Sequence, residues 1–216
     1  MLKLGLTGGI ASGKSAVGEI FVQLGAHLLQ SDAVAHSLMQ PGRAVYDEVV
    51  RRFGREILNP GGSINRSRLA EAAFGTPGAP PRVRELNEIV HPAVIAHESD
   101  WMEEIGRRDP KAIVMIEAAL ILEARAAGRF DRLIVVTCQP EQRILRYARR
   151  LGISEEAARA EVTRRMAAQI PDAEKIKAAD FVIDNSGSLE ETGRQVKRVF
   201  AELRPDNGEP SSGDSD

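Results

Sequence analysis

The stretch GLTGGIASGKSAVG, residues 5–18, contains the pattern G-x-x-x-x-G-K-[ST] at Gly8, Gly13, Lys14 and Ser15. The short apolar run before it predicts a strand, and the apolar side chains after it recur with the period of a helix. A glycine-rich loop between a strand and a helix directs backbone N–H groups and the positive end of the helix dipole at one anion. The alternative is a glycine-rich turn that matches the pattern by chance. Because the match lies between a predicted strand and a predicted helix, the stretch instead predicts a loop that binds nucleotide phosphates.

Each part of the pattern has a chemical role in such a loop. The glycines let the backbone curl around the phosphates. Lys14 reaches the β- and γ-phosphates, and Ser15 offers its hydroxyl to Mg²⁺. The pattern therefore indicates ATP or GTP with Mg²⁺, and it does not identify the group that receives the phosphate.

Segments typical of strands and of helices alternate along the rest of the chain. Apolar runs, near-continuous in the third and fourth, predict strands at 2–7, 26–32, 112–117, 132–137 and 180–184. Helical periodicity is found at 33–39, 43–53, 66–74, 82–107, 141–151, 155–168, 172–178 and 189–203. This alternation predicts an α/β fold with a parallel sheet. Gly- and Pro-rich composition predicts a loop at 75–81 and a disordered tail at 205–216.

Composition and charge narrow the class of protein. The 216 residues include 29 basic and 31 acidic side chains, a net charge of −2, so no overall field draws nucleic acid or an anionic membrane. Aromatic residues make up 4%, and no apolar run approaches the roughly 20 residues of a membrane span. The first residues have no signal-peptide pattern. These features predict a cytoplasmic protein with small-molecule partners, and they leave the oligomeric state open, a monomer included.

Cysteine and histidine positions bear on metal sites. The single cysteine, Cys138, permits neither an intrachain disulfide nor a Cys-rich zinc site, and it follows a predicted buried strand, as a packing residue would. The histidines at 27, 36, 91 and 97 lack the spacing of metal ligands. No protein-held transition metal is expected.

Two carboxylates stand at the ends of predicted strands, Asp32 after the second and Glu117 after the third. Ligands gather at the carboxyl ends of strands in sheets of this kind, so both are expected near Lys14. A carboxylate there could accept a proton from an attacking hydroxyl, or hold Mg²⁺ through water. The alternative for Asp32 is equally weighted: Ser31 or Asp32 could be the N-cap of the following helix.

Arginines cluster late in the chain, four of them within 143–150 and two more at 164 and 165. Most such charges lie on solvated surface. Phosphoryl transfer nevertheless needs cations around the γ-phosphate, because its transition state spreads charge over three oxygens. One or two of these arginines are expected to serve, and the residues alone do not say which.

Six stretches, in matching order and spacing, carry a resemblance to a known family. They are GLTGGIASGKS (5–15), SDAVAHSLMQPG (31–42), LNEIVHP (86–92), EAALILEA (117–124), RILRYARRLGISEEAARAEVTRRMAAQ (143–169) and AADFVIDNSGS (178–188). Together they span nearly the whole chain, from about 4 to 200, and resemble the dephospho-CoA kinase family. The resemblance implies ATP-dependent phosphorylation of the ribose 3′-hydroxyl of dephospho-CoA, the last step of coenzyme A synthesis.

The resemblance also implies the architecture. It implies a P-loop NTPase fold over residues 3–201, with a parallel five-stranded sheet and helices on both faces. A helical substrate-binding segment is implied at about 33–110 and a helical lid at about 154–178. ATP and the Mg²⁺ carried with it are the implied cofactors.

Site residues carry over position by position. Asp32 matches the family's likely base, and Lys14 and Arg146 complete the implied catalytic set. ATP binding is implied for Gly8, Gly9, Ala11, Ser12, Gly13, Lys14, Ser15, Ala16, Arg150 and Asn185, the last near the adenine. Ser15 is the implied contact to Mg²⁺.

Substrate binding is implied for Asn87 and His91, and we assign Glu117 with them; Arg165 and Gln169 match lid positions. His91 stands before Pro92 and could instead be a histidine packed at a bend. Three positions depart from the family pattern: Gln30 where an aspartate is common, His36 where an arginine is common, and Ala119 where a proline is usual. They bear on substrate contacts and leave the reaction class unchanged.

Two other functions fit a P-loop. One is a different small-molecule kinase, acting on a nucleoside monophosphate or a small alcohol. The other is a nucleotide-dependent switch protein, which the sequence supports poorly because it has no N-K-x-D stretch and no D-x-x-G after the third strand.

Overall fold

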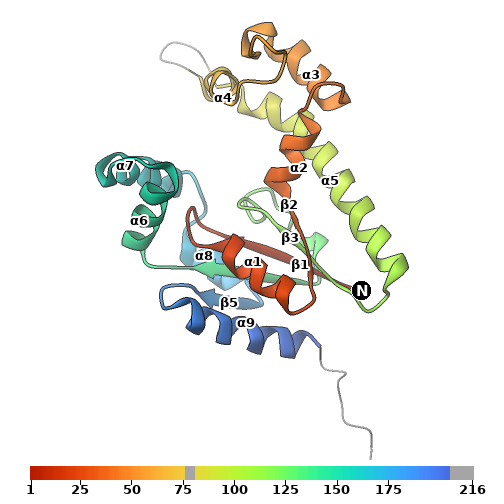
Figure 1. The fold of residues 1–216 in the computed structure, drawn as a ribbon, viewed down its shortest axis with the longest axis vertical. Coiled ribbons are helices and arrows are strands. Elements are labelled where there is room, and N and C mark those ends of the chain that lie inside the picture. Colours follow the sequence, from red (N-terminus) through yellow and green to blue (C-terminus); the bar gives the residue numbers. More distant parts are fainter. Residues whose placement is uncertain (76–80, 205–216) are drawn as a thin grey trace, which may run out of the picture. The chain divides into compact units, whose positions relative to one another are not determined.

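The computed structural model describes residues 1–75 and 81–204; the predicted tail at 205–216 and most of the predicted loop at 75–81 lie outside the described residues. Figure 1 labels most of its helices and strands. The elements are β1 (Leu2–Gly8), α1 (Lys14–Gln23), β2 (His27–Gln30), α2 (Ser31–Leu38), α3 (Ala44–Phe53), η1 (Arg55–Ile57), α4 (Arg66–Phe74), α5 (Val83–Arg108), β3 (Ile113–Glu117), η2 (Ala127–Arg129), β4 (Arg132–Thr137), α6 (Pro140–Leu151), α7 (Glu155–Ala167), α8 (Asp172–Ala178), β5 (Phe181–Asp184) and α9 (Leu189–Leu203). The predicted alternation of strands and helices is confirmed.

The chain forms two compact units. The first combines Met1–Leu28 with the chain from Ala112 onward and holds most of the sheet, and the second is Leu29–Lys111 and is mainly helical. The second unit nearly coincides with the segment 33–110 that the family resemblance assigns to substrate binding. That role stays a prediction.

The sheet has the strand order β2-β3-β1-β4-β5. β1 pairs in parallel with both β3 and β4, and β4 pairs in parallel with β5. The register sets Leu6 beside Glu117 and Gly8 beside Val136. The glycine-rich segment at residues 8–15, the P-loop, therefore follows β1 at the edge of the sheet where the carboxyl ends of the strands meet. This is the edge at which α/β sheets bind ligands. The predicted parallel five-stranded sheet is confirmed.

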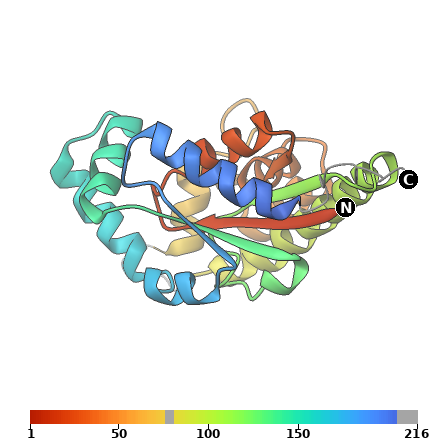
Figure 2. The ribbon, with the colours of Figure 1, turned by 90° about the horizontal axis from the view of Figure 1, so that it is seen from below.

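Layers of helix and loop cover both faces of the sheet, as predicted. On one face, Val17 and Phe21 of α1 and Val196 of α9 join apolar side chains of the strands in a single core; α9 is the blue helix in Figure 2. On the other face, Leu133 and Val135 pack with the apolar segment that follows β3, and α8 contacts β4. The strands are buried on both sides, which explains their near-continuous apolar runs.

Helices α2 to α5 of the second unit surround a separate apolar core. Val45, Val49 and Phe53 recur every four residues along α3, and all three are buried. Asn65 caps α4 because its side-chain oxygen accepts hydrogen bonds from two N–H groups of the first turn. The unit thus has its own core and its own helix-end signals.

The largest error in the predicted elements is at the end of the second strand. β2 ends at Gln30, and Ser31 and Asp32 already belong to the first turn of α2, so the predicted strand end at Asp32 is wrong by two residues. Gln30 is the N-cap residue, without a side-chain cap hydrogen bond. The alternative that Ser31 or Asp32 caps the helix is therefore also wrong. An acidic side chain is nevertheless favourable where Asp32 lies, because the helix dipole is positive there.

Candidate active site

The P-loop has left-handed backbone at a glycine and also at an alanine. Gly13 has a φ of 94° and Ala11 a φ of 53°. Lys14 begins α1, and its Nζ donates to the carbonyl oxygens of Gly8 at 3.1 Å and Gly9 at 3.2 Å. The lysine thus folds back across the loop, and no side chain caps the first turn of α1. The positive end of the α1 dipole therefore lies at the loop, as the sequence pattern predicts.

Asn185 supports the loop from the protein side. Its Nδ2 donates to the carbonyl of Ser12 at 2.9 Å, and its Oδ1 accepts from the hydroxyl of Thr192 at 2.8 Å. A Cβ on Gly13 would lie only 2.0 Å from Nδ2, so the loop approaches this amide as closely as a glycine allows. The side chain of Asn185 is buried against protein partners, and its contact with ATP stays a prediction.

Glu117 and Ser15 form the polar pair at the mouth of the loop. Glu117 is the last residue of β3 and is 9% exposed, and its Oε1 accepts a hydrogen bond from the Ser15 hydroxyl at 2.9 Å. Their oxygens are the hard donors that Mg²⁺ prefers, and a magnesium ion that also binds ATP needs only one or two protein ligands. The donor set therefore fits Mg²⁺ carried with ATP. Strand register, which places Glu117 beside Leu6, is what brings the pair together.

Two arginines of α6 reach the loop. Arg146 donates from Nη1 to the Ser12 carbonyl at 3.2 Å and from Nη2 to the Asn185 carbonyl at 2.8 Å. Arg143 is 1% exposed and contacts the loop from behind. Arg150 is exposed and lies over the ring of Tyr147, its guanidinium carbon 5.3 Å from the ring centroid. The structure therefore brings Arg146 to the loop and leaves the ATP contact of Arg150 a prediction.

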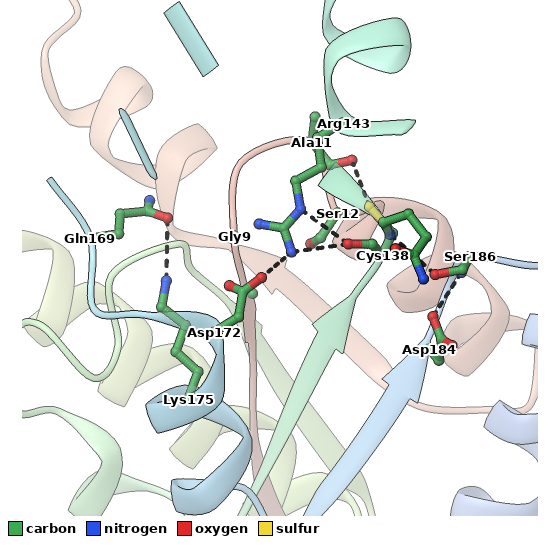
Figure 3. Close-up of polar contacts among 12 residues, drawn as sticks. Gly9, Ala11, Ser12, Cys138, Arg143, Gln169, Asp172, Lys175, Asp184 and Ser186 are labelled. Atoms are coloured by element: carbon green, nitrogen blue, oxygen red, sulfur yellow. Dashed lines mark hydrogen bonds and ion pairs between the residues drawn. The ribbon is translucent and has the colours of Figure 1, made fainter. Parts of the chain in front are cut away.

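Sequence reasoning missed a buried charged cluster beside the loop. Arg143 pairs with Asp172 at the start of α8. Lys175, one turn further on, donates to Gln169 at 3.2 Å and pairs with Glu123 at 3.0 Å (Figure 3 draws the contact to Gln169). Charged side chains are almost never fully buried unless they are paired, so several arginines close together in the sequence are expected to be exposed to solvent. The available signal was the amphipathic pattern of α6, which places Arg143 in line with buried Tyr147 four residues later.

Cys138 packs under the loop. It is 7% exposed, and its Sγ lies 3.9 Å from the carbonyl oxygen of Ala11. Burial raises the pKa of its thiol above the ordinary value. This agrees with the packing role that its position after a buried strand predicts.

The remaining predicted site residues belong to the second unit. Asp32 is exposed in the first turn of α2. Asn87 and His91 lie four residues apart on α5, on one face of the helix. His91 is exposed although it precedes Pro92 inside the helix, so the alternative of a packed histidine is wrong. Beside Asp32, the Ser31 hydroxyl donates to the buried carboxylate of Glu98 at 2.5 Å.

The described residues include neither a membrane-spanning helix nor a cluster of acidic, His or Cys side chains that could hold a metal ion. Within residues 1–75 and 81–204, no helix has the length and apolar character needed to cross a membrane. The same residues contain no group of three or more His, Cys, Asp or Glu side chains placed to hold a metal ion.

Comparison with known proteins identifies the family. The sequence profile of the dephospho-CoA kinases matches residues 2–191. The chain is 40% identical to the dephospho-CoA kinase of Aquifex aeolicus (strain VF5) over 207 residues, covering 95% of this chain and 100% of that protein.

Two solved structures are also similar. The crystal structure of TT1252 from Thermus thermophilus gives a TM-score of 0.74 at 34% identity, covering 94% of this chain and 97% of that one. The dephospho-CoA kinase from Campylobacter jejuni gives a TM-score of 0.67 at 25% identity, covering 95% and 98%. The chain belongs to the dephospho-CoA kinase family, transferases that use ATP to carry out the last step of coenzyme A synthesis.

Proposed function

We propose that this protein binds MgATP on the P-loop and transfers its γ-phosphoryl group to the ribose 3′-hydroxyl of dephospho-CoA, with Asp32 as the base. The observation that carries the proposal is the arrangement of Lys14, Ser15 and Glu117 at the carboxyl edge of the sheet in a chain of this family. The bacterial relatives support a cytoplasmic location, which stays a prediction.

The loop supplies the charges that hold the triphosphate. Backbone N–H groups of the loop and the N-terminal end of α1 would face an anion bound there. Lys14, which now contacts two loop carbonyls, exchanges these neutral partners for phosphate oxygens. The exchange strengthens its hydrogen bonds because the new acceptor is charged.

Ser15 and Glu117 would hold Mg²⁺, which neutralises charge on the β- and γ-phosphates when it is bound with ATP. The Ser15 hydroxyl is already oriented by Glu117, so its lone pairs are placed before the metal arrives. The carboxylate of Glu117 then remains close to the metal as a compensating negative charge.

Arg146 orders the same loop at its C-terminal half. It joins the carbonyls of Ser12 and Asn185, and therefore ties the loop to the end of β5. Its guanidinium contributes positive charge near the site where the transition state develops negative charge. The side chain is partly exposed, so phosphate oxygens can reach it.

Asp32 and the second unit supply the acceptor side of the reaction. A ribose hydroxyl is a weak nucleophile at neutral pH, and a carboxylate within hydrogen-bond reach can orient it and remove its proton. Asp32 is exposed and is not the N-cap of its helix, so it is free of the structural role that competed with catalysis. Asn87 and His91 of α5 belong to the same unit and would contact dephospho-CoA.

The lid is proposed to be residues 154–178. It comprises α7, α8 and their connection, and α7 packs on α6 through Ala158 and Val162. Closure over ATP would exclude water, which otherwise competes as the phosphoryl acceptor.

The test of the catalytic assignment is Asp32→Asn. We expect turnover to fall by roughly 10²–10⁴-fold, the usual effect of losing a positioned base, while ATP binding stays near the parent value. Asp47→Asn is the matched control, because Asp47 is also an exposed acid in the first turn of a helix of the same unit. Both changes weaken a helix-dipole contact by less than about 1 kcal/mol. An Asp32→Asn enzyme as active as Asp47→Asn would show that Asp32 is not the base.

A further inference from the structure

The guanidinium of Arg143 is held behind the P-loop by three contacts. Its Nε and Nη2 both donate to the carbonyl oxygen of Cys138 at 3.3 Å, and Nη2 pairs with a carboxylate oxygen of Asp172. Figure 3 shows these contacts converging beside Gly9, which is drawn next to the guanidinium. The arginine comes from the first turns of α6, the aspartate from the start of α8, and the cysteine directly follows β4. The contact therefore joins three parts of the fold to the loop.

The guanidinium lies where a side chain at position 9 would begin, so it keeps its present place only beside a glycine. A Cβ on Gly9 would lie 2.1 Å from Nη1 of Arg143 and 3.3 Å from Oδ1 of Asp172. The guanidinium therefore occupies the volume in which any other residue at position 9 would place its side chain. Backbone and cation are in van der Waals contact at the point where the loop leaves β1.

One hydrogen-bond donor of the Arg143 guanidinium has no acceptor within the described part of the chain. Nη1 of Arg143 is buried and has no hydrogen-bond partner among the described residues, although Nε and Nη2 are both satisfied. The side chain as a whole is 1% exposed. Leaving a buried charged donor unpaired is costly, and a well-packed apolar side chain at this position would avoid that cost. The donor points at the segment of the loop that is to receive several negative charges.

We propose that Arg143 is a positioning residue for ATP, whose buried charge supports the loop at Gly9 and attracts the phosphates through it, while Asp172 reduces that attraction. The proposal rests on the proposed function, in which the loop binds the ATP phosphates. A charge held in a buried, preorganised site acts on an anion more strongly than one in water. Asp172 is 34% exposed and is the counter-charge that makes the buried cation tolerable without ligand.

The charges of the two partners have opposite signs, so their neutralisation distinguishes an electrostatic role from a structural one. In an electrostatic role, Arg143→Met weakens ADP binding and Asp172→Asn strengthens it. Asn keeps an oxygen that accepts from Nη2, so Asp172→Asn removes the charge and retains the hydrogen bond. If the pair is only a tie between α6 and α8, Arg143→Met loosens the loop and weakens binding, whereas Asp172→Asn keeps the hydrogen bond and binds ADP no more tightly than the parent.

The experiment is isothermal calorimetry of ADP with Mg²⁺ on the full chain. We expect the dissociation constant of ADP to rise about tenfold in Arg143→Met, to fall severalfold in Asp172→Asn, and to recover most of the loss in Arg143→Lys. The KM for ATP should follow the same order while the KM for dephospho-CoA stays constant. Lys175→Met is the matched control: it removes an equally buried cation that pairs with Glu123 and Gln169, and it should change ADP affinity less than Arg143→Met does.

The outcomes separate the inference from the function on which it rests. Parent protein that binds no ADP would refute the proposed function itself. Parent protein that binds ADP, with weaker binding in Arg143→Met and equal or weaker binding in Asp172→Asn, would overturn only the electrostatic role of Arg143. If Arg143→Met does not fold, Asp172→Asn decides alone, because ADP affinity equal to or below that of the parent contradicts the proposal.

Discussion

Replacing Glu117 with Gln should weaken the response of the enzyme to Mg²⁺ without disturbing the loop. Glu117 is 9% exposed, and its Oε1 accepts the Ser15 hydroxyl at 2.9 Å. Gln has the same shape and still offers a carbonyl oxygen to that hydroxyl. The substitution therefore removes one negative charge and leaves the hydrogen bond in place, so its effect reports the charge alone.

The size of the effect follows from the distance. Mg²⁺ binds oxygen at about 2.0–2.1 Å, so a metal on the Ser15 hydroxyl lies within about 5 Å of the Glu117 carboxylate. At that separation the attraction is about 1.7 kcal/mol in a water-like dielectric and about 7 kcal/mol at an effective dielectric constant of 20. Ser15 is exposed, and Mg²⁺ keeps several waters, so the lower value applies. The expected loss is roughly 10–100-fold, as for other carboxylates that orient a metal ligand.

The assay is a Mg²⁺ titration at saturating ATP and dephospho-CoA, with Mg²⁺-dependent ADP binding measured by calorimetry. The concentration of Mg²⁺ giving half-maximal response should rise by roughly 10–100-fold in both measurements. Glu19→Gln makes the same charge change at an exposed position of α1 and should leave both values near those of the parent. A Glu117→Gln enzyme with the Mg²⁺ response of Glu19→Gln would refute the assignment of this carboxylate to the metal.

Two further predictions concern the loop and the lid. Lys14→Ala should lower turnover by roughly 10²–10³-fold and weaken ATP binding, because it removes a cation from the β- and γ-phosphates; steady-state kinetics and calorimetry check this, and near-normal turnover would contradict the role of Lys14. Hydrogen exchange within 154–178 should slow when an unreactive ATP analogue and dephospho-CoA are both bound, because closure protects the helices; unchanged exchange there with slowing elsewhere would count against a lid.

The fold was predictable because burial leaves its pattern in the sequence. β3 and β4 lie inside the sheet and are covered on both faces. Their near-continuous runs of Ile, Val, Leu and Met are typical of such buried parallel strands. The strand–loop–helix setting of 5–18 added the phosphate-binding motif. The end of β2 was misplaced because four residues contain little periodicity, and Ser31 and Asp32 occur both after strands and at the start of helices.

The site was predictable only where a residue lies at the end of a strand or in a motif. Glu117 was correctly placed beside the P-loop because parallel strands end at one edge. The amphipathic pattern of α6 is the one sequence signal for the burial of Arg143. The partners of Arg143 and Lys175 were not predictable, because Asp172 and Glu123 are distant from them in sequence. Among the arginines of 143–150, the family resemblance pointed to Arg146 and Arg150, and only the folded structure shows that Arg143 is buried and Arg150 exposed.

The most direct test of the central claim is the identity of the phosphoryl acceptor. The purified protein is given MgATP with dephospho-CoA, AMP, CMP or shikimate in separate reactions, and ADP release is measured together with the position of phosphate in the product. We predict ADP release with dephospho-CoA alone, and a product that carries its new phosphate on the ribose 3′-oxygen. ADP release with one of the other acceptors and none with dephospho-CoA would contradict the account.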